Sequence, residues 1–380
     1  IATGPRRPVC LRAVAVRQRG VPTAGASRIP GSCAVPVRSA RGNDRGSAVR
    51  ATNEGDGPMA TLGLRGIAGA LLAVTVVACQ VPADPASALA EQAGPVRRSD
   101  QFQAVAGNGT TLVVVGAFGA VLSSSDNGRT WAREELPGKP PLIAVSACPD
   151  GSYAALDFYR KVWLGDRAAK QWQVKELKTR ANPLALACDP RGRIWVVGSN
   201  STILASGDRG ATWQETSLGE DAMLTTIQFL DGEHAVVSGE FGLFLTTADG
   251  GAHWVPGTRI SDDFYPYAAL FSDPSTGSVS GLGGVIVHTV DGGRTWTREP
   301  NRTGAPMYGV VDHGGETWAL GVNGLVLKRT QREWMPTAQG LPAPWLRAGR
   351  SLGPTAMLVA GGAGTLQIVS TASAASGAGN

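Results

Sequence analysis

The sequence predicts an all-β protein, a seven-bladed β-propeller of four-stranded antiparallel blades, and the spacing of its tryptophans is the first observation behind this prediction. Trp131, Trp172, Trp213 and Trp254 follow one another at intervals of 41 residues. A period near 40 residues with strand-rich content is typical of a propeller blade. The second observation is the composition, because 17% charged residues and 51 glycines favour many short strands joined by tight turns.

Seven repeat units fill residues 98–375, and each is expected to contribute four strands. In the first unit, Ala104–Ala106, Leu112–Gly116 and Val121–Ser124 are short apolar runs between turn residues, and a fourth strand starts at Trp131. A glycine turn, GAFG in this unit, joins the second strand to the third in most units. One four-stranded sheet cannot bury both of its faces, whereas seven sheets stacked around an axis bury them all.

A second turn, SSDNGRTW in the first unit, joins the third strand to the fourth and recurs in the third, fourth and fifth units. Its Asp side chain is expected to bond backbone N–H groups of the turn, its Gly to supply a positive φ, and its Trp to pack between adjacent sheets. Because the motif occurs once per blade, we interpret it as structural rather than catalytic. Its residues are Asp126, Gly128, Trp131, Asp208, Gly210, Trp213, Asp249, Gly251, Trp254, Asp291, Gly293 and Trp296.

These turns resemble the bacterial neuraminidase repeat, or Asp-box. Residues 124–131 and 206–213 match the form S-x-D-x-G-x-T-W, and residues 247–254 and 289–296 have Thr in place of Ser. Combined with the glycine turn, the repeats over 98–375 resemble the photosystem II stability/assembly factor family. That resemblance implies a lumenal or periplasmic propeller that binds a newly made membrane-protein partner and is not an enzyme. The Asp-box itself is specific for the fold but weak for function.

The turns between second and third strands share one face of the predicted ring with the loops between blades, and we expect this face to bind a protein partner. Its aromatic and basic side chains suit such a partner, since aromatic residues and Arg are enriched at interfaces. The alternative is that each of these side chains is merely solvated. The candidate residues are Phe118, Tyr159, Arg160, Arg180, Phe241, Arg259 and Arg302.

The main alternative function is a glycoside hydrolase of the sialidase type, which resembles this chain in its Asp-boxes. Such a site needs three converging arginines, a Tyr nucleophile with a Glu partner and an Asp acid. The sequence has neither a FRIP-like element nor a long catalytic insertion, so we expect no enzyme. No cofactor or metal is expected either, because the four His residues have no ligand spacing, although Asp262 and Asp263 form a minor candidate cation site. The net charge of +5 is scattered, which does not indicate a nucleic-acid partner.

The segment before the repeats predicts export. Residues 1–58 are interpreted as upstream sequence translated from a mis-set start or as a disordered extension, with a genuine basic tail as the alternative. Residues 59–97 read as an export signal and linker. Residues 76–79 (VVAC) resemble a bacterial lipobox, which would make Cys79 the lipidated first residue of a periplasmic or membrane-anchored lipoprotein. Cleavage after residues 88–90 (ALA) is the alternative.

Two further expectations concern the folded part of the chain. Cys148 and Cys188 are expected to be small buried thiols, because a disulfide would require two neighbouring strands within about 7 Å. The segment 95–103 is expected to pair with the last blade as its fourth strand and so to close the ring of a monomer.

Overall fold

The computed structural model describes residues 93–338 and 340–371, and the expected export signal and Cys79 lie outside these residues. The first three blades are formed by β1 (Phe102–Gly107), β2 (Leu112–Gly116), β3 (Ala120–Ser124), β4 (Ala132–Glu135), β5 (Leu142–Ala147), β6 (Tyr153–Asp157), β7 (Lys161–Gly165), β8 (Trp172–Glu176), β9 (Pro183–Cys188), β10 (Ile194–Gly198), β11 (Thr202–Ser206) and β12 (Gln214–Ser217). The next three are formed by β13 (Leu224–Phe229), β14 (Ala235–Gly239), β15 (Phe244–Thr247), β16 (Val255–Pro256), β17 (Pro266–Phe271), β18 (Gly277–Gly281), β19 (Ile286–Thr289), β20 (Thr297–Glu299), β21 (Met307–His313), β22 (Glu316–Gly321), β23 (Val326–Thr330) and β24 (Glu333–Pro336). The seventh contains β25 (Leu346–Ser351), β26 (Ala356–Gly361) and β27 (Leu366–Ser370).

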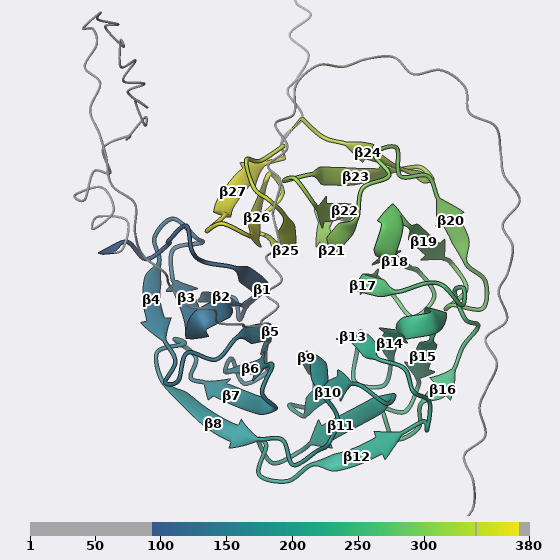
Figure 1. Ribbon diagram of the computed structural model, residues 1–380, viewed down its shortest axis with the longest axis horizontal. Helices are drawn as coiled ribbons and strands as arrows, with labels where there is room; N and C mark the ends of the chain where they lie inside the picture. The colour runs from purple at the N-terminus through teal and green to yellow at the C-terminus, as the bar shows by residue number, and fades with distance from the viewer. Residues whose placement is uncertain (1–92, 339, 372–380) are drawn as a thin grey trace, which may run out of the picture. The chain divides into compact units, whose positions relative to one another are not determined.

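The sheets are arranged as a ring of seven antiparallel blades (Figure 1), which confirms the predicted fold class. The first strand of each blade faces the centre of the ring and the fourth lies at its outer edge. Burial follows this order: β2 is buried along its whole length, whereas β4 is mostly exposed. Three short 3-10 helices, η1 (Ala117–Gly119), η2 (Glu240–Gly242) and η3 (Leu282–Gly284), stand at the turns between second and third strands.

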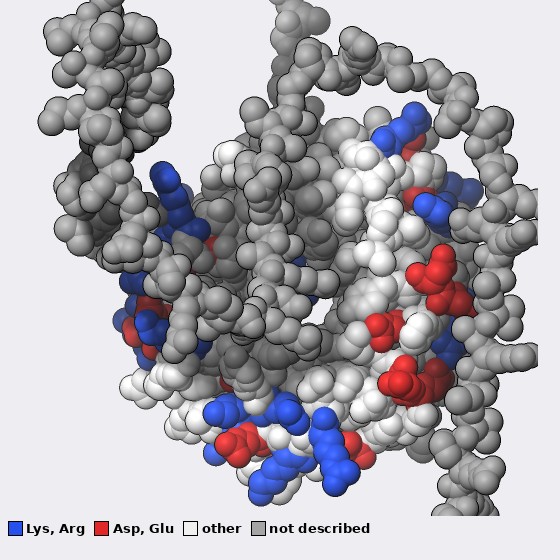
Figure 2. All heavy atoms as spheres, viewed as in Figure 1, with Lys and Arg blue, Asp and Glu red and all other residues white. Residues whose placement is uncertain are grey.

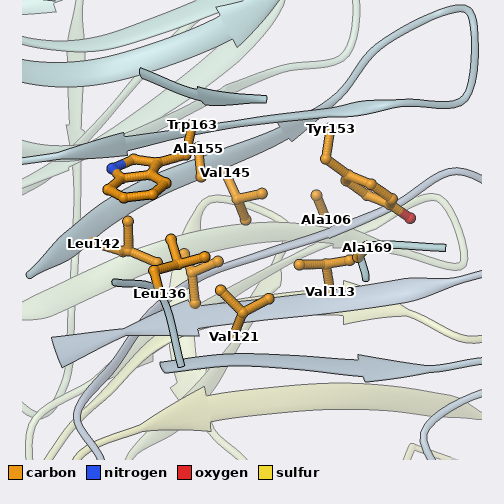
Figure 3. Close-up of a cluster of buried hydrophobic side chains, with 11 residues drawn as sticks. Ala106, Val113, Val121, Leu136, Leu142, Val145, Tyr153, Ala155, Trp163 and Ala169 are labelled. Atoms are coloured by element: carbon orange, nitrogen blue, oxygen red, sulfur yellow. The ribbon is translucent and has the colours of Figure 1, made fainter. Parts of the chain in front are cut away.

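The core is divided into clusters that lie between adjacent blades. Figure 3 shows the cluster between blades one and two, where Val113 and Val121 of blade one pack with Leu142, Tyr153 and Trp163 of blade two. Burial of these side chains is the main favourable term that holds one blade against the next.

The repeat tryptophans pack against the cluster between their own blade and the preceding one. Trp172 belongs to the cluster of blades one and two, Trp213 to that of blades two and three, and Trp254 to that of blades three and four. Trp131 packs in the cluster that joins blade one to blade seven. The regular 41-residue interval therefore reflects one packing position repeated around the ring.

The ring closes differently from the sequence expectation. The described part of blade seven has three strands, and residues 95–101 do not pair with it as a fourth, so that prediction is wrong. The segment instead contacts the turn between β26 and β27, where the Gly364 amide donates to the Asp100 carbonyl at 2.8 Å. The buried Asp100 carboxylate accepts two hydrogen bonds from Arg133 at 2.9 and 3.0 Å. The segment before β1 is thus held to blade one by a buried ion pair and to blade seven by a turn contact.

The cysteine prediction is also wrong, because Cys148 and Cys188 form a disulfide. They follow and end the inner strands β5 and β9 of neighbouring blades, with their Cα atoms 5.1 Å apart. Two cysteines at equivalent positions of adjacent repeats are brought within bonding distance by the stacking of the blades.

Candidate functional site

The Asp-box turn of blade one is held together by its own polar groups. The Ser124 hydroxyl donates to the Asp126 carboxylate at 2.8 Å and accepts from the Gly128 amide at 2.8 Å. The backbone and hydroxyl of Thr130 both donate to Asp126, at 2.9 and 2.6 Å. Gly128 has a φ of 83°, a conformation that costs glycine nothing.

The same hydrogen bonds recur at Asp208, Asp249 and Asp291, where His253 replaces the threonine in blade four. The hydrogen bonds from the Thr130 side chain and backbone lower the pKa of Asp126 to about 2, and equivalent bonds lower the pKa of Asp208 to about 2. Each carboxylate is therefore ionised at neutral pH and serves its own turn, on a different blade from the others.

The opposite face carries the turns between second and third strands, and these turns expose large apolar side chains. The exposed fraction is 61% for Phe118, 65% for Tyr159 and 52% for Phe241. Phe158 and Leu282, which are 54% and 56% exposed, belong to the same turns. The segment LDFYRK at 156–161, which departs from the glycine turn, singles out Phe158 in the sequence, whereas no such departure singles out Leu282.

Two of these aromatic residues have a backbone conformation that L-residues usually avoid. Phe118 has a φ of 58° and Phe241 a φ of 57°. The equivalent residues of blades three and six are Asn200 and Asn323, both with a φ of 55°. Asn tolerates this region well, whereas a bulky residue there is an outlier.

Blade two builds its turn with a buried carboxylate. Asp157 accepts hydrogen bonds from the Tyr159 and Lys161 amides at 2.8 and 3.0 Å, and from the Trp163 indole at 2.9 Å. The rings of Phe158 and Tyr159 lie edge to face with centroids 6.0 Å apart. The buried Asp157 thus holds two exposed aromatic rings on a rigid turn.

Two of the four arginines predicted for the binding face form ion pairs, and two do not. Arg259 donates to Glu220 at 2.5 Å, and Arg302 donates to Glu333 at 2.8 Å. Arg160 and Arg180 are exposed and form no ion pair with any residue that the structure describes. In Figure 2, basic side chains gather at the lower rim of the visible face, where Figure 1 shows blades two and three.

A cleft and the placement of possible metal ligands bear on the alternatives of a hydrolase and a cation site. A cleft of about 940 Å³ lies between blades four and five beside the Asp-box of Asp291, and Arg294 is the one arginine among its described lining residues. Over residues 93–338 and 340–371, no group of three or more His, Cys, Asp or Glu side chains is arranged to hold a metal ion. Asp263 of the minor candidate cation site accepts a hydrogen bond from Ser261. Within the same ranges, no helix has the length and apolar character needed to cross a membrane.

Comparison with known proteins gives both sequence and structural similarities. A family model described as photosynthesis system II assembly factor YCF48 matches residues 165–263. The photosystem II assembly lipoprotein Ycf48 of Synechococcus sp. (strain CC9605) is 32% identical over 165 residues, which cover 42% of this chain and 48% of that protein. The chain thus spans less than half the length of the curated relatives it matches.

Two solved structures share the fold. A structure of YCF48 bound to D1 peptide has a TM-score of 0.59 at 16% identity, covering 73% of this chain and 95% of that one. An inactive virginiamycin B lyase from Staphylococcus aureus has a TM-score of 0.63 at 11% identity, covering 72% of this chain and 96% of that one. Since the same fold serves a binding protein and an enzyme, the fold alone does not decide between them. The family model and the relatives confirm the resemblance that the repeats indicate, to the photosystem II stability/assembly factor family.

Proposed function

We propose that the chain is an exported, non-enzymatic propeller that binds an exported segment of a membrane protein during assembly of a membrane-protein complex of the photosystem II type. The names of its relatives and the D1 peptide bound by a YCF48 of the same fold support this proposal. The binding face is formed by the turns between second and third strands, together with Arg160 and Arg180.

The exposed aromatic residues at positive φ are the observation that carries the proposal. A non-glycine residue in the left-handed region costs about 1–2 kcal/mol. Phe118 and Phe241 bear this cost on the surface, although Asn occupies the equivalent position in two other blades. Strain kept at an exposed position is a reason to expect function there. Large aromatic side chains on rigid turns are suited to anchor a partner.

Binding of a labelled D1 peptide to the full chain, followed by fluorescence anisotropy, tests the face. The variant F118N/F241N is expected to bind at least tenfold more weakly. Val290 is the matched control because it is 69% exposed but lies in an Asp-box turn. V290N should bind like the parent chain; equal losses in both variants, or no loss in F118N/F241N, would argue against this face.

The non-enzymatic part of the proposal has its own test. A sialidase-type hydrolase would release the fluorophore from an aryl sialoside or another aryl glycoside. The purified chain is expected to give no more release than buffer. If the chain releases the fluorophore, and substitution of an arginine or a carboxylate abolishes that release, the chain is a hydrolase and the proposal of a binding protein is wrong.

The lipid anchor and the domain limits are part of the same proposal. We propose that residues 98–375 form the mature folded unit and that Cys79 carries the lipid, in keeping with relatives named as lipoproteins. Mass spectrometry of the mature N-terminus identifies the modified residue. The C79S variant should move from the membrane fraction to the soluble fraction, whereas cleavage after residue 90 would leave that distribution unchanged.

A further inference from the structure

Every blade has an irregularity at the same point of its inner strand. The register between the first and second strands shifts by one residue just after the inner strand begins, which is a β-bulge. A bulge turns a side chain out of its normal alternation. The bulged residues are Gln103, Ile143, Leu184, Thr225, Tyr267, Tyr308 and Arg347.

These seven residues, here called the inner rim, are accessible to solvent. Each is half-buried or exposed, whereas the residue before it is buried in all seven blades. The register places them beside the binding face, because the start of each inner strand pairs with the residue that precedes the turn between second and third strands, as Phe102 pairs with Gly116. In blade five the residue just before the inner strand contacts this turn, because the Leu282 amide donates to the Tyr265 carbonyl at 2.9 Å.

The inner rim is chemically uneven. Blades two and three contribute aliphatic side chains, whereas blades five, six and seven contribute Tyr267, Tyr308 and Arg347. The rings of Tyr267 and Tyr308 lie 5.2 Å apart in a T-shaped arrangement, and Tyr265 packs on Tyr267 at 5.7 Å. Arg347 lies close enough for its charge to act on all three phenols. Three consecutive blades thus bring three phenols and one guanidinium together.

The polar groups of this cluster lack partners among the residues that the structure describes. Arg347 takes part in none of the ion pairs formed there, and none of the three phenol oxygens takes part in a hydrogen bond there. Burial raises the pKa of Tyr265 and Tyr267, so both phenols keep their protons and are able to donate. The cluster therefore presents one planar cation and several hydroxyl donors with no acceptor assigned to them.

We infer that the inner rim at Tyr267, Tyr308 and Arg347 binds a carboxylate on an extended peptide segment, either an acidic side chain or a free C-terminus. A guanidinium matches a carboxylate with two parallel hydrogen bonds, and phenols add further donors. A single positive charge balances a single carboxylate, whereas a doubly charged phosphate would need more. The aliphatic side of the inner rim gives the adjoining part of the peptide an apolar surface.

The position of the bound carboxylate within the cluster is set by Glu240. The charge of Glu240 acts on Tyr265, and its carboxylate already accepts from the Met223 amide at 2.9 Å. A second carboxylate close to it would be repelled. The ligand should therefore sit between Tyr308 and Arg347, on the side away from Tyr265.

This inference rests on the proposed function in one respect, that the ligand is a segment of a protein. Its test uses variants other than those that test the proposed function. Three N-acetylated eight-residue peptides of Gly and Ser with one central Leu serve as probes in NMR titrations of the full chain. One carries Asp and a C-terminal amide, one carries Asn and the amide, and one carries Asn and a free C-terminus. At least one carboxylate peptide should bind ten times more tightly than the neutral one, and the stronger of the two identifies the source of the carboxylate.

Variants then assign the binding to the inner rim. R347Q should reduce binding of the carboxylate peptide to the level of the neutral peptide, and Y308F should weaken it several-fold without removing charge. Arg129 is the matched control, because it is an exposed arginine of an Asp-box turn on the opposite face and forms no ion pair with a residue that the structure describes, and R129Q should change nothing. Equal binding of all three peptides, or equal losses in R129Q and R347Q, would overturn the inference. F118N/F241N leaves the inner rim intact, so failure of one test does not imply failure of the other.

Discussion

Removal of the Glu299 carboxylate is expected to destabilise the ring more than any exposed charge change at the same blade interface. Glu299 lies on β20 of blade five and is almost completely buried. It accepts from Arg329 of blade six at 2.6 and 2.9 Å, and from the buried Trp334 indole at 3.0 Å. The last repeat tryptophan has no Asp-box of its own, and its indole N–H instead donates to a carboxylate of the preceding blade.

The size of the effect follows from burial. Breaking a buried ion pair by removing one partner costs about 3–5 kcal/mol. The Arg329 side chain is 23% exposed and is able to recover some hydration, which favours the lower part of that range. The Trp334 N–H remains buried without an acceptor and adds about 1–3 kcal/mol. We therefore expect E299A to lower the free energy of unfolding by about 4 kcal/mol, within the combined range of these two effects.

Urea denaturation followed by tryptophan fluorescence measures this loss, and the same chain supplies the control. Glu333 and Arg302 join the same two blades, but their side chains are 33% and 63% exposed. An exposed pair contributes about 0–1 kcal/mol, so E333A should be nearly neutral. A loss below about 1 kcal/mol for E299A, or similar losses for both variants, would refute the reasoning from burial.

Three further predictions concern the disulfide, the strained turns and the Asp-boxes. The Cys148–Cys188 bond spans 40 residues, so its reduction should cost at most about 4 kcal/mol by loop-closure entropy; a denaturation midpoint insensitive to reductant would contradict this. F118N and F241N should each change the free energy of unfolding by less than about 1 kcal/mol, because Asn relieves the strain of a positive φ and this gain offsets the contact area lost with the ring. A larger loss of stability in calorimetry would mean that these rings pack against the fold. The pKa of Asp126 is about 2, below its usual 3.8, so its contribution is present above pH 3.8 and is lost as the pH falls through 2. D126N should therefore flatten the decline of the urea midpoint between pH 4 and pH 2, and an unchanged slope would count against the hydrogen bonds assigned to this carboxylate.

The parts of the fold that follow from repetition could be predicted from the sequence, because repetition is visible as a period. The interval of 41 residues predicts the number of blades and the positions of turns such as that of Asp126. The sequence does carry a signal for the disulfide: Cys148 and Cys188 are 40 residues apart, which is one repeat and hence the same place on the next blade. The stacked blades bring such positions together without any local signal.

Contacts that break the repeat could not be predicted in this way. Glu299 accepts a hydrogen bond from the Trp334 indole, 35 residues further along the chain, and no spacing rule indicates this contact. The pairing of Arg259 with Glu220 across 39 residues likewise depends on loop geometry. The inner rim depends on bulges, which are properties of backbone register and leave no residue pattern, so the sequence alone does not single out Tyr308 and Arg347.

The two faces of the ring have diverged to different extents, and this difference bears on where recognition takes place. On one face, Asp126 and its equivalents repeat the same hydrogen bonds, and each turn satisfies itself. On the other face, the turns keep a left-handed backbone but change the side chain that stands on it, from Phe118 to Asn200 to Phe241. A single partner is asymmetric, so a seven-fold surface recognises it only where the repeats differ. Divergence at fixed backbone geometry therefore supports the proposal that this face is the one that recognises a partner.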